Sequence, residues 1–205
     1  MANSLLEDTI ATIDGNRVLV APLNWGIGHA TRCVPMIKAL LEADKDVIIA
    51  ADGYPLQLLK RQFPQLLAIE FSWAKVHYSK SSSQFMSMLY QTPKFIYSII
   101  KEHFALKKIV EQYNIDVVIS DNRFGLWCKK RLSIYITHQI SVKTGTKNTF
   151  LDKLLYRIHK VIIERYDECW IPDFEDDSDN LSGDLSHKYP LPKNAKFIGI
   201  LSRFG

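Results

Sequence analysis

The residues best suited to chemistry lie in a glycine-containing loop near the start of the chain. Residues 23–32 read LNWGIGHATR, which places Gly26, Gly28 and His29 between an apolar run and a helical pattern. Backbone N–H groups at the start of a helix can receive an anion, because they lack partners within the helix and lie at its positive end. The spacing matches neither GxGxxG nor GxxxxGK[ST], so neither a dinucleotide site nor a Walker-type phosphate site is predicted. The alternative is a tight turn that binds nothing.

Asp121 is the second candidate, at the end of the apolar run 115–120. A carboxylate in such a place needs water or a polar partner. In the predicted sheet its natural neighbour is the loop that carries His29. The alternative is that Asp121 caps a short helix from Asn122 toward Lys130. The two roles do not exclude each other.

Four more polar residues are expected at the same rim. Arg32 and Arg123 could contact an anionic ligand, or their charges could simply be solvated. His138 and Gln139 follow the next apolar run, 133–137. A histidine in a rim loop is more often a hydrogen-bonding group than a catalyst, so the residue types alone assign His138 no role.

The elements that must position these residues alternate along the chain. Apolar runs predict strands at Arg17–Pro22, Asp46–Ala51 and residues 66–71, 115–120, 133–137, 169–172 and 196–200. Helical patterns cover residues 30–44, 55–62, 93–113 and 151–166, with a short helix-like piece around residues 85–89. This rhythm predicts an α/β fold, with a doubly wound, mostly parallel sheet of about seven strands. In the order 3-2-1-4-5, ligands bind outside the carboxyl ends of strands 1 and 4.

Prolines and the leading segment indicate where helices and the domain should begin. Proline is tolerated only in the first turn of a helix, so Pro35 predicts that the helix of residues 30–44 does not begin much before His29. Thr92 is predicted to be the N-cap of the helix of residues 93–113, with Pro93 as its first residue. Residues 1–16 are mixed and weakly patterned, so they are interpreted as a tail, and residues 17–205 as one domain.

The charge and cysteine content of the chain limit the kinds of partner and site that it can be expected to have. The chain has 26 basic and 22 acidic side chains, but six of the acidic ones crowd between Asp173 and Asp184, so the rest is distinctly basic. Phosphates, a phospholipid surface or nucleic acid would suit that charge, but no known nucleic-acid-binding motif appears. The three scattered cysteines predict neither a zinc site nor disulfides, which favours the cytoplasm. The acidic run lacks the glycine of a calcium loop, because Ser178 stands there, and it reads as a solvated linker.

Residues 85–104 carry more apolar surface than one face against a sheet requires, and lysines surround them. No apolar string is long enough to span a bilayer. Such a segment suits either peripheral contact with an anionic membrane or a broad core helix with ordinary solvated lysines.

A resemblance adds to this. The strand, the Gly-x-Gly-His loop and the helix of residues 18–41 resemble the opening of GT-B fold glycosyltransferases, most of all family 28 and related uncharacterised bacterial transferases. Residues 28–32, GHATR, have the Gly-His-x-x-Arg form of those relatives. The likeness continues more loosely through residues 119–125, 136–139, 182–187 and 198–204, and so covers residues 17–205.

The resemblance implies an amino-terminal, acceptor-binding half of a nucleotide-sugar-dependent glycosyltransferase. It implies His29 as the general base and Asp121 as the carboxylate that orients it. The residues expected to bind substrate are Gly26, Gly28, Arg32, Asn122, Arg123, His138 and Gln139. It further implies a sugar or lipid-linked acceptor and a nucleotide-sugar co-substrate, with no metal or other cofactor.

The donor-binding carboxy-terminal domain of such enzymes does not follow within these 205 residues, so the chain alone is expected to be inactive. Two alternatives stay open. One is a non-catalytic acceptor-binding subunit of a split two-chain glycosyltransferase. The other is a fragment of a GT-B-fold nucleotide-sugar epimerase.

Overall fold

The computed structural model describes residues 2–72, 84–141, 149–176 and 179–202, with side chains from Ser4 onward and, in the helix that starts at residue 84, from Thr92 onward. Its centre is a seven-stranded sheet in the order β3-β2-β1-β4-β5-β6-β7, with every neighbouring pair parallel. The strands are β1 (Arg17–Pro22), β2 (Asp46–Ala51), β3 (Ala68–Glu70), β4 (Val117–Asp121), β5 (Leu132–Ile136), β6 (Glu168–Ile171) and β7 (Ala195–Phe197). The predicted α/β class, the doubly wound sheet and the order 3-2-1-4-5 are confirmed.

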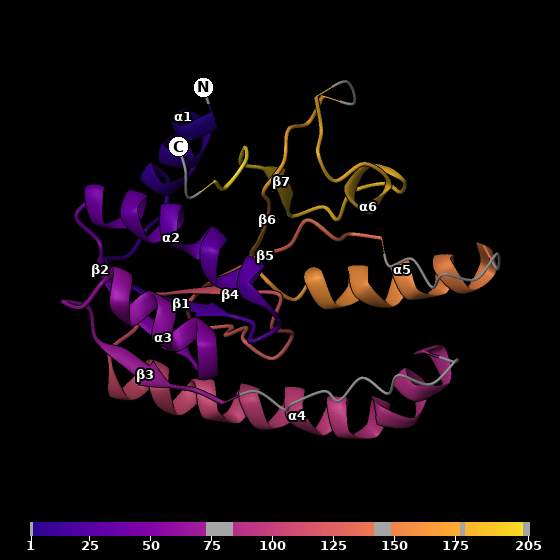
Figure 1. Ribbon diagram of the computed structural model, residues 1–205, viewed down its shortest axis with the longest axis horizontal. Helices are drawn as coiled ribbons and strands as arrows, with labels where there is room; N and C mark the ends of the chain where they lie inside the picture. The colour runs from indigo at the N-terminus through magenta and orange to yellow at the C-terminus, as the bar shows by residue number, and fades with distance from the viewer. Residues whose placement is uncertain (1, 73–83, 142–148, 177–178, 203–205) are drawn as a thin grey trace.

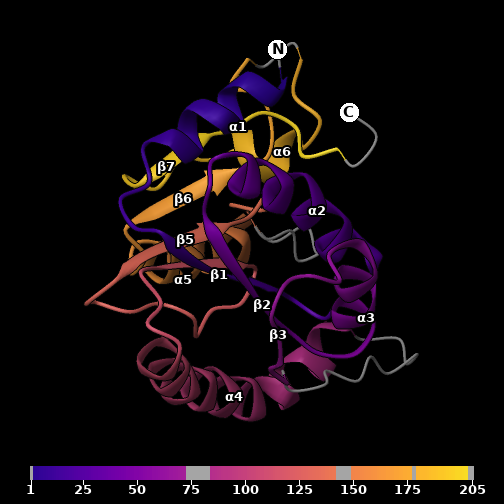
Figure 2. The same ribbon diagram turned by 90° about the vertical axis from the view of Figure 1, so that its left-hand side faces the viewer.

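Helices cover both faces of the sheet (Figures 1 and 2). On one face lie α1 (Ala2–Ala11), α2 (Ile27–Glu42) and α3 (Gly53–Gln62), which share one apolar core with the sheet. On the other face lie α4 (Gln84–Gln112) and α5 (Thr149–Ile163), each with its own apolar cluster. The central strands β1 and β4 are therefore buried on both sides, which explains why they read as continuous apolar runs.

The leading segment is not a tail. Residues 2–11 form α1, and three apolar side chains, Leu6, Ile10 and Ile13, are buried in the core beside α2. Their spacing of four and three residues is the helical one, but it is too short a pattern to stand out among the polar residues around it. The interpretation of these residues as a tail is wrong.

The prolines do not lie in first turns as predicted. Helix α2 begins at Ile27, close to the predicted start, but carries Pro35 in its interior. Helix α4 begins at Gln84 and carries Pro93 in its interior, so the prediction of Thr92 as its N-cap is wrong. A proline inside a helix costs about 3 kcal/mol locally. In α2 the buried side chains Cys33, Met36 and Leu40 pack against the sheet, and burial of that size outweighs the cost.

The loop after β4 lies very close to α4. A Cβ on Gly125 would come within 2.5 Å of the backbone carbonyl oxygen of Ile99, so only glycine allows this approach. Residues 122–130 form turns and no helix. The alternative role of Asp121 as the cap of a helix there is therefore wrong. A short helix that the sequence did not predict, α6 (Asp184–His187), follows β6.

Candidate functional site

Three neighbouring strands bring the site together at the carboxyl edge of the sheet. In the register of the ladder, Pro22 at the end of β1 lies beside Asp121 at the end of β4, which in turn lies beside Ile136 at the end of β5. The backbone N–H of Leu23 donates to the carbonyl oxygen of Asp121 at 3.0 Å. The loops that follow β1, β4 and β5 are thereby held side by side, at the switch point expected from the strand order.

The loop after β1 is open to solvent. Gly26 precedes α2 with φ at 81°, a backbone conformation that favours glycine, and no side chain caps the helix there. A Cβ at Gly28 would meet nothing within 4 Å. Both glycines and their neighbours Trp25 and Ile27 are exposed. The first-turn N–H groups therefore face a space where a ligand can approach.

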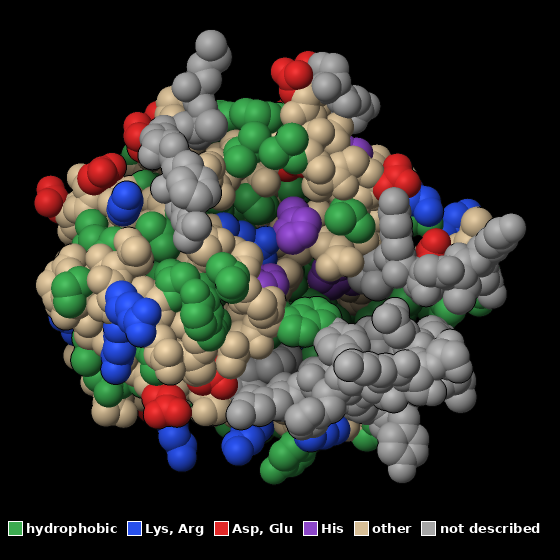
Figure 3. Space-filling view, in the orientation of Figure 1, with side chains coloured by type: hydrophobic (Ala, Val, Ile, Leu, Met, Phe, Trp, Pro, Cys, Tyr) green, Lys and Arg blue, Asp and Glu red, His purple; other side chains and the backbone are tan. Residues whose placement is uncertain are grey.

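His29 and Asp121 meet across the switch point. The Nδ1 atom of His29 lies 3.2 Å and 3.1 Å from the two carboxylate oxygens of Asp121. The carboxylate is only 1% exposed and the imidazole 12%. Every contact of the ring among the described residues is made by Nδ1, and its Nε2 is not a buried atom. The ring thus has one nitrogen for the protein and one for a ligand, and histidine side chains gather around a hollow on this face (Figure 3).

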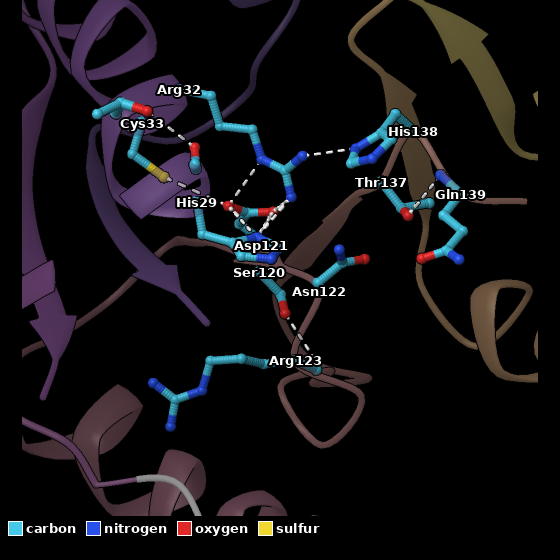
Figure 4. A network of polar contacts seen from close by, with 12 residues as sticks. His29, Arg32, Cys33, Ser120, Asp121, Asn122, Arg123, Thr137, His138 and Gln139 are labelled. Carbon is cyan, nitrogen blue, oxygen red and sulfur yellow. Dashed lines mark hydrogen bonds and ion pairs between the residues drawn. The ribbon is translucent and has the colours of Figure 1, made fainter. Parts of the chain in front are cut away.

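Arg32 lies at the centre of the polar cluster, one turn after His29 on α2 (Figure 4). Its Nε donates to Asp121 Oδ2 at 2.9 Å, and one terminal nitrogen donates to Oδ1. Burial acts to raise the pKa of Asp121, but the charge of Arg32 and the contact with His29 outweigh it, so the pKa lies below its ordinary value. Asp121 is therefore a carboxylate anion, and Arg32 is its counter-ion rather than a solvated side chain.

The loop after β5 completes the cluster. Arg32 also approaches His138, with 2.7 Å between its other terminal nitrogen and Nδ1 of the imidazole. Gln139 is half-buried, and its backbone N–H donates to Thr137 Oγ1 at 3.0 Å. Asn122 is half-buried with φ at 56°, and its side-chain oxygen accepts a hydrogen bond from the buried Tyr135 hydroxyl at 3.1 Å. His138 thus lies beside Arg32 and the dyad, and Asn122 directly follows Asp121, while Gln139 lies beyond His138 (Figure 4).

Arg123 does not join the site. Its guanidinium points away from Arg32 and Asp121 (Figure 4) and is fully buried. It is paired with Glu102 on α4, donates to the carbonyl oxygen of Phe71 at 3.3 Å and lies over the ring of that residue. The prediction of Arg123 as a ligand-binding residue does not fit this geometry, because its guanidinium is buried and already paired with the carboxylate of Glu102. The ion pair of Arg123 with Glu102 instead holds the loop after β4 against α4.

Comparison with known proteins is informative at the level of the fold. No protein-family model matches the sequence, and neither does any curated protein. Several solved structures are similar. CalG4, the calicheamicin glycosyltransferase, has a TM-score of 0.54 and 11% identity over 92% of this chain and 52% of its own. The chain has the fold of one Rossmann-like half of a GT-B glycosyltransferase.

Two weaker likenesses accompany it. MurG of Acinetobacter baumannii has a TM-score of 0.47 and 10% identity over 79% of this chain and 42% of its own. UGT73P12 of Glycyrrhiza uralensis, solved with glycyrrhetinic acid 3-O-monoglucuronide, has a TM-score of 0.48 and 11% identity over 78% and 44%. The chain spans about half the length of the structures it matches.

The structure also shows the surroundings of two residues to which the sequence assigned no role in the site. The Cys33 thiol lies 3.8 Å from Asp121 Oδ2, and burial together with that carboxylate raises its pKa well above the usual value, so the thiol stays protonated. The position of Cys33 four residues after His29, on the same face of the helix, was the available sequence signal.

Asp173, predicted in a solvated linker, is instead fully buried. Its carboxylate accepts backbone N–H groups of Phe174, Leu181 and Ser182.

Among the residues that the structure describes, no three His, Cys, Asp or Glu side chains are grouped as a metal ion would require. Within the same residues, no helix is both long and apolar enough to cross a membrane. Asp177 and Ser178 of the acidic run lie outside the described part of the chain.

Proposed function

We propose that this chain is the acceptor-binding half of a nucleotide-sugar-dependent glycosyltransferase in which His29 is the general base. The observation that carries the proposal is the contact of His29 Nδ1 with both oxygens of Asp121, at the switch point of the sheet, with Nε2 left for a ligand. A carboxylate on one imidazole nitrogen fixes the tautomer and stabilises the cation that forms when the other nitrogen takes a proton.

The chemistry follows from these positions. In the reacting state, Nδ1–H of His29 donates to Asp121 and Nε2 carries the lone pair. Nε2 takes the proton of the acceptor hydroxyl as its oxygen bonds to the anomeric carbon of the donor sugar, and the bond from that carbon to the nucleoside diphosphate breaks. Sugar transfer of this kind needs the donor held opposite the acceptor, which we assign to a second half in the same polypeptide or in a partner subunit.

The test begins with the gene beyond codon 205, which provides either the continuing polypeptide or a neighbouring donor-binding subunit. Transfer of labelled sugar from UDP-glucose, UDP-N-acetylglucosamine and dTDP-glucose to an extract of cellular acceptors is measured with the complete protein, with its His29→Ala and Asp121→Asn variants, and with the 205-residue chain alone. General-base catalysis is worth about a factor of 10² to 10⁴, so both variants should lose activity on that scale.

The matched control is His103→Asn, because that histidine stacks on Trp127 outside the dyad. It should keep the wild-type rate. Sugar transfer by the 205-residue chain alone, or a His29→Ala enzyme as fast as the wild type, would refute the proposal.

We further propose that the chain contacts an anionic membrane surface through α4 and α5, which lie on the same face of the sheet (Figure 1). Each helix exposes an apolar stripe to solvent. The side chains concerned are Ile96, Tyr97, Ile100 and Phe104 on α4, and Phe150, Leu154, Ile158 and Val161 on α5. Exposed basic residues such as Lys94, Lys101 and Arg157 flank the stripes. Apolar burial in the interface and attraction to anionic lipids would act together there. The predicted contributions of Phe85, Met88 and Leu89 lie outside the described side chains.

A further inference from the structure

Arg32 contacts three charged or titratable side chains of the cluster: His29, Asp121 and His138. Its side chain is 11% exposed, and its guanidinium lies between Asp121 and His29 on one side and His138 on the other (Figure 4). The terminal nitrogen that donates to Asp121 Oδ1 is also 2.6 Å from Nδ1 of His29. The other terminal nitrogen is 2.7 Å from Nδ1 of His138.

The chemistry of a guanidinium decides what His138 can do. Arginine carries N–H donors and no acceptor, so Nδ1 of His138 must accept and cannot hold a proton. A neutral imidazole then carries its proton on Nε2. Burial, the positive charge of Arg32 and the nearby His29 lower the pKa of His138. The carboxylates of Asp121 and Asp173 act to raise it, but the net effect is a lowered pKa. The Nε2 atom has no hydrogen-bond partner among the described residues and is not buried.

His29 contacts the same guanidinium, but Asp121 sets its tautomer. As a base through Nε2, His29 must hold its proton on Nδ1 and donate it to Asp121, whose oxygens lie at 3.1 Å and 3.2 Å. The other tautomer would place the Nδ1 lone pair against a buried carboxylate, so the N–H group of Arg32 at 2.6 Å does not displace that proton. Asp121 therefore fixes the tautomer of His29, and Arg32 fixes that of His138.

We propose that Arg32 is the positioning residue of this site, because its N–H group on Nδ1 of His138 fixes that imidazole as a hydrogen-bond donor through Nε2. His138 then donates to an oxygen of the acceptor or donor. The catalytic consequence rests on the proposed function, but the tautomer of His138 is a property of the chain itself.

The experiment measures those tautomers directly on the purified 205-residue chain. Long-range correlation of imidazole ¹⁵N and carbon-bound protons distinguishes Nδ1–H from Nε2–H rings, and the His29→Gln and His138→Gln variants assign the two signals. At pH 8 the wild type should show the Nε2–H form at His138 and the Nδ1–H form at His29. In Arg32→Met, His138 should lose its single tautomer and its pKa should rise to or above its ordinary value, whereas His29 should keep its proton on Nδ1.

A second variant keeps the test decisive. Arg32→Lys preserves the charge beside Asp121, but a single ammonium cannot direct N–H groups to two imidazoles, so His138 should lose its single tautomer there too. Arg17→Lys is the matched control, because Arg17 pairs with Asp46 at the start of β1, away from the site. It should change neither signal.

Two results would overturn the inference. The first is an Nδ1–H form of His138 in the wild type, and the second is an unchanged tautomer of His138 in both Arg32 variants. Sugar transfer is not measured here, so a failure of the proposed function in the transfer assay leaves this result standing, and the reverse is also true.

Discussion

Breaking the ion pair between Arg32 and Asp121 should destabilise the protein by several kcal/mol, while removing both partners together should cost much less. The two side chains are 11% and 1% exposed. Asp121→Asn leaves the guanidinium almost buried without a counter-ion, and Arg32→Met leaves the carboxylate with only His29 and the Cys33 thiol. Removal of one partner of a buried pair costs about 3–5 kcal/mol, whereas replacing both with uncharged groups is often close to neutral.

The coupling energy is therefore the quantity to measure. If each single variant loses about 3 kcal/mol and the double variant loses about 2 kcal/mol or less, the two residues are coupled by roughly 4 kcal/mol. Urea unfolding followed by far-UV circular dichroism at pH 7 gives the four free energies. In a chain of 205 residues, such single losses should lower Tm by roughly 6–12 °C.

The control cycle uses Arg17 and Asp46, whose side chains are 41% and 45% exposed although their contact is only 2.6 Å long. Exposed pairs contribute about 1 kcal/mol or less, so this coupling should be small and should weaken with added salt. If the losses of Arg32→Met and Asp121→Asn simply add, or if their coupling is no larger than that of the control pair, the reasoning is wrong.

The pH dependence has a definite sign. The pKa of Asp121 in the folded protein lies below its ordinary value of 3.8: burial alone would raise it, but Arg32 and His29 more than offset that effect. The unfolded chain therefore binds the proton first as the pH falls. The stability that this carboxylate contributes is complete above its ordinary pKa and is lost as the pH drops through the lower, folded value. The advantage of the wild type over Asp121→Asn should accordingly shrink in strong acid.

Three further outcomes are expected. Burial lowers the pKa of His159 from 6.5 to about 4. As the pH falls from 6.5 to 4, the free energy of unfolding of the wild type should therefore decrease by up to about 3 kcal/mol more than that of His159→Gln, measured by urea unfolding. Parallel plots of unfolding free energy against pH for the two proteins would contradict this. Ile10→Ala in α1, 1% exposed, should cost about 2–4 kcal/mol, whereas Leu5→Ala, 44% exposed, should cost about 0.5 or less; equal losses would restore the interpretation as a tail. The chain should float with vesicles containing phosphatidylglycerol but not with neutral ones, and a variant with Tyr97→Ser and Ile100→Ser should float less. No flotation of the wild type would refute the membrane proposal.

The local pattern of the chain was enough to predict the architecture and the meeting of His29 with Asp121. Central strands of a parallel sheet are buried on both faces, so their apolar runs are easy to recognise. Crossover connections keep neighbouring strands parallel, and residues that follow two such strands must therefore emerge at the same edge. The prediction that these two residues would be neighbours needed nothing more than that rule.

Arg32 and Arg123 show where that rule ends. Both arginines follow strands at the same rim, and the sequence offered no reason to treat them differently. The structure pairs Arg32 with Asp121 inside the site and Arg123 with Glu102 on the far side of the loop after β4. Each choice depends on a carboxylate supplied by a segment distant in the chain, which no local pattern reports.

The same limit applies to the prolines, the leading helix and Asp173. Pro35 is tolerated because the face of α2 around it is buried. Helix α1 is ordered because Leu6 and Ile10, with Ile13 just after the helix, pack into the same core. Periodicity and residue type determined the strands, their order and the rim on which the site lies, because these follow from local backbone geometry. The partner of each buried charge was decided by tertiary structure alone, since desolvation makes every such charge depend on whichever group the fold brings beside it.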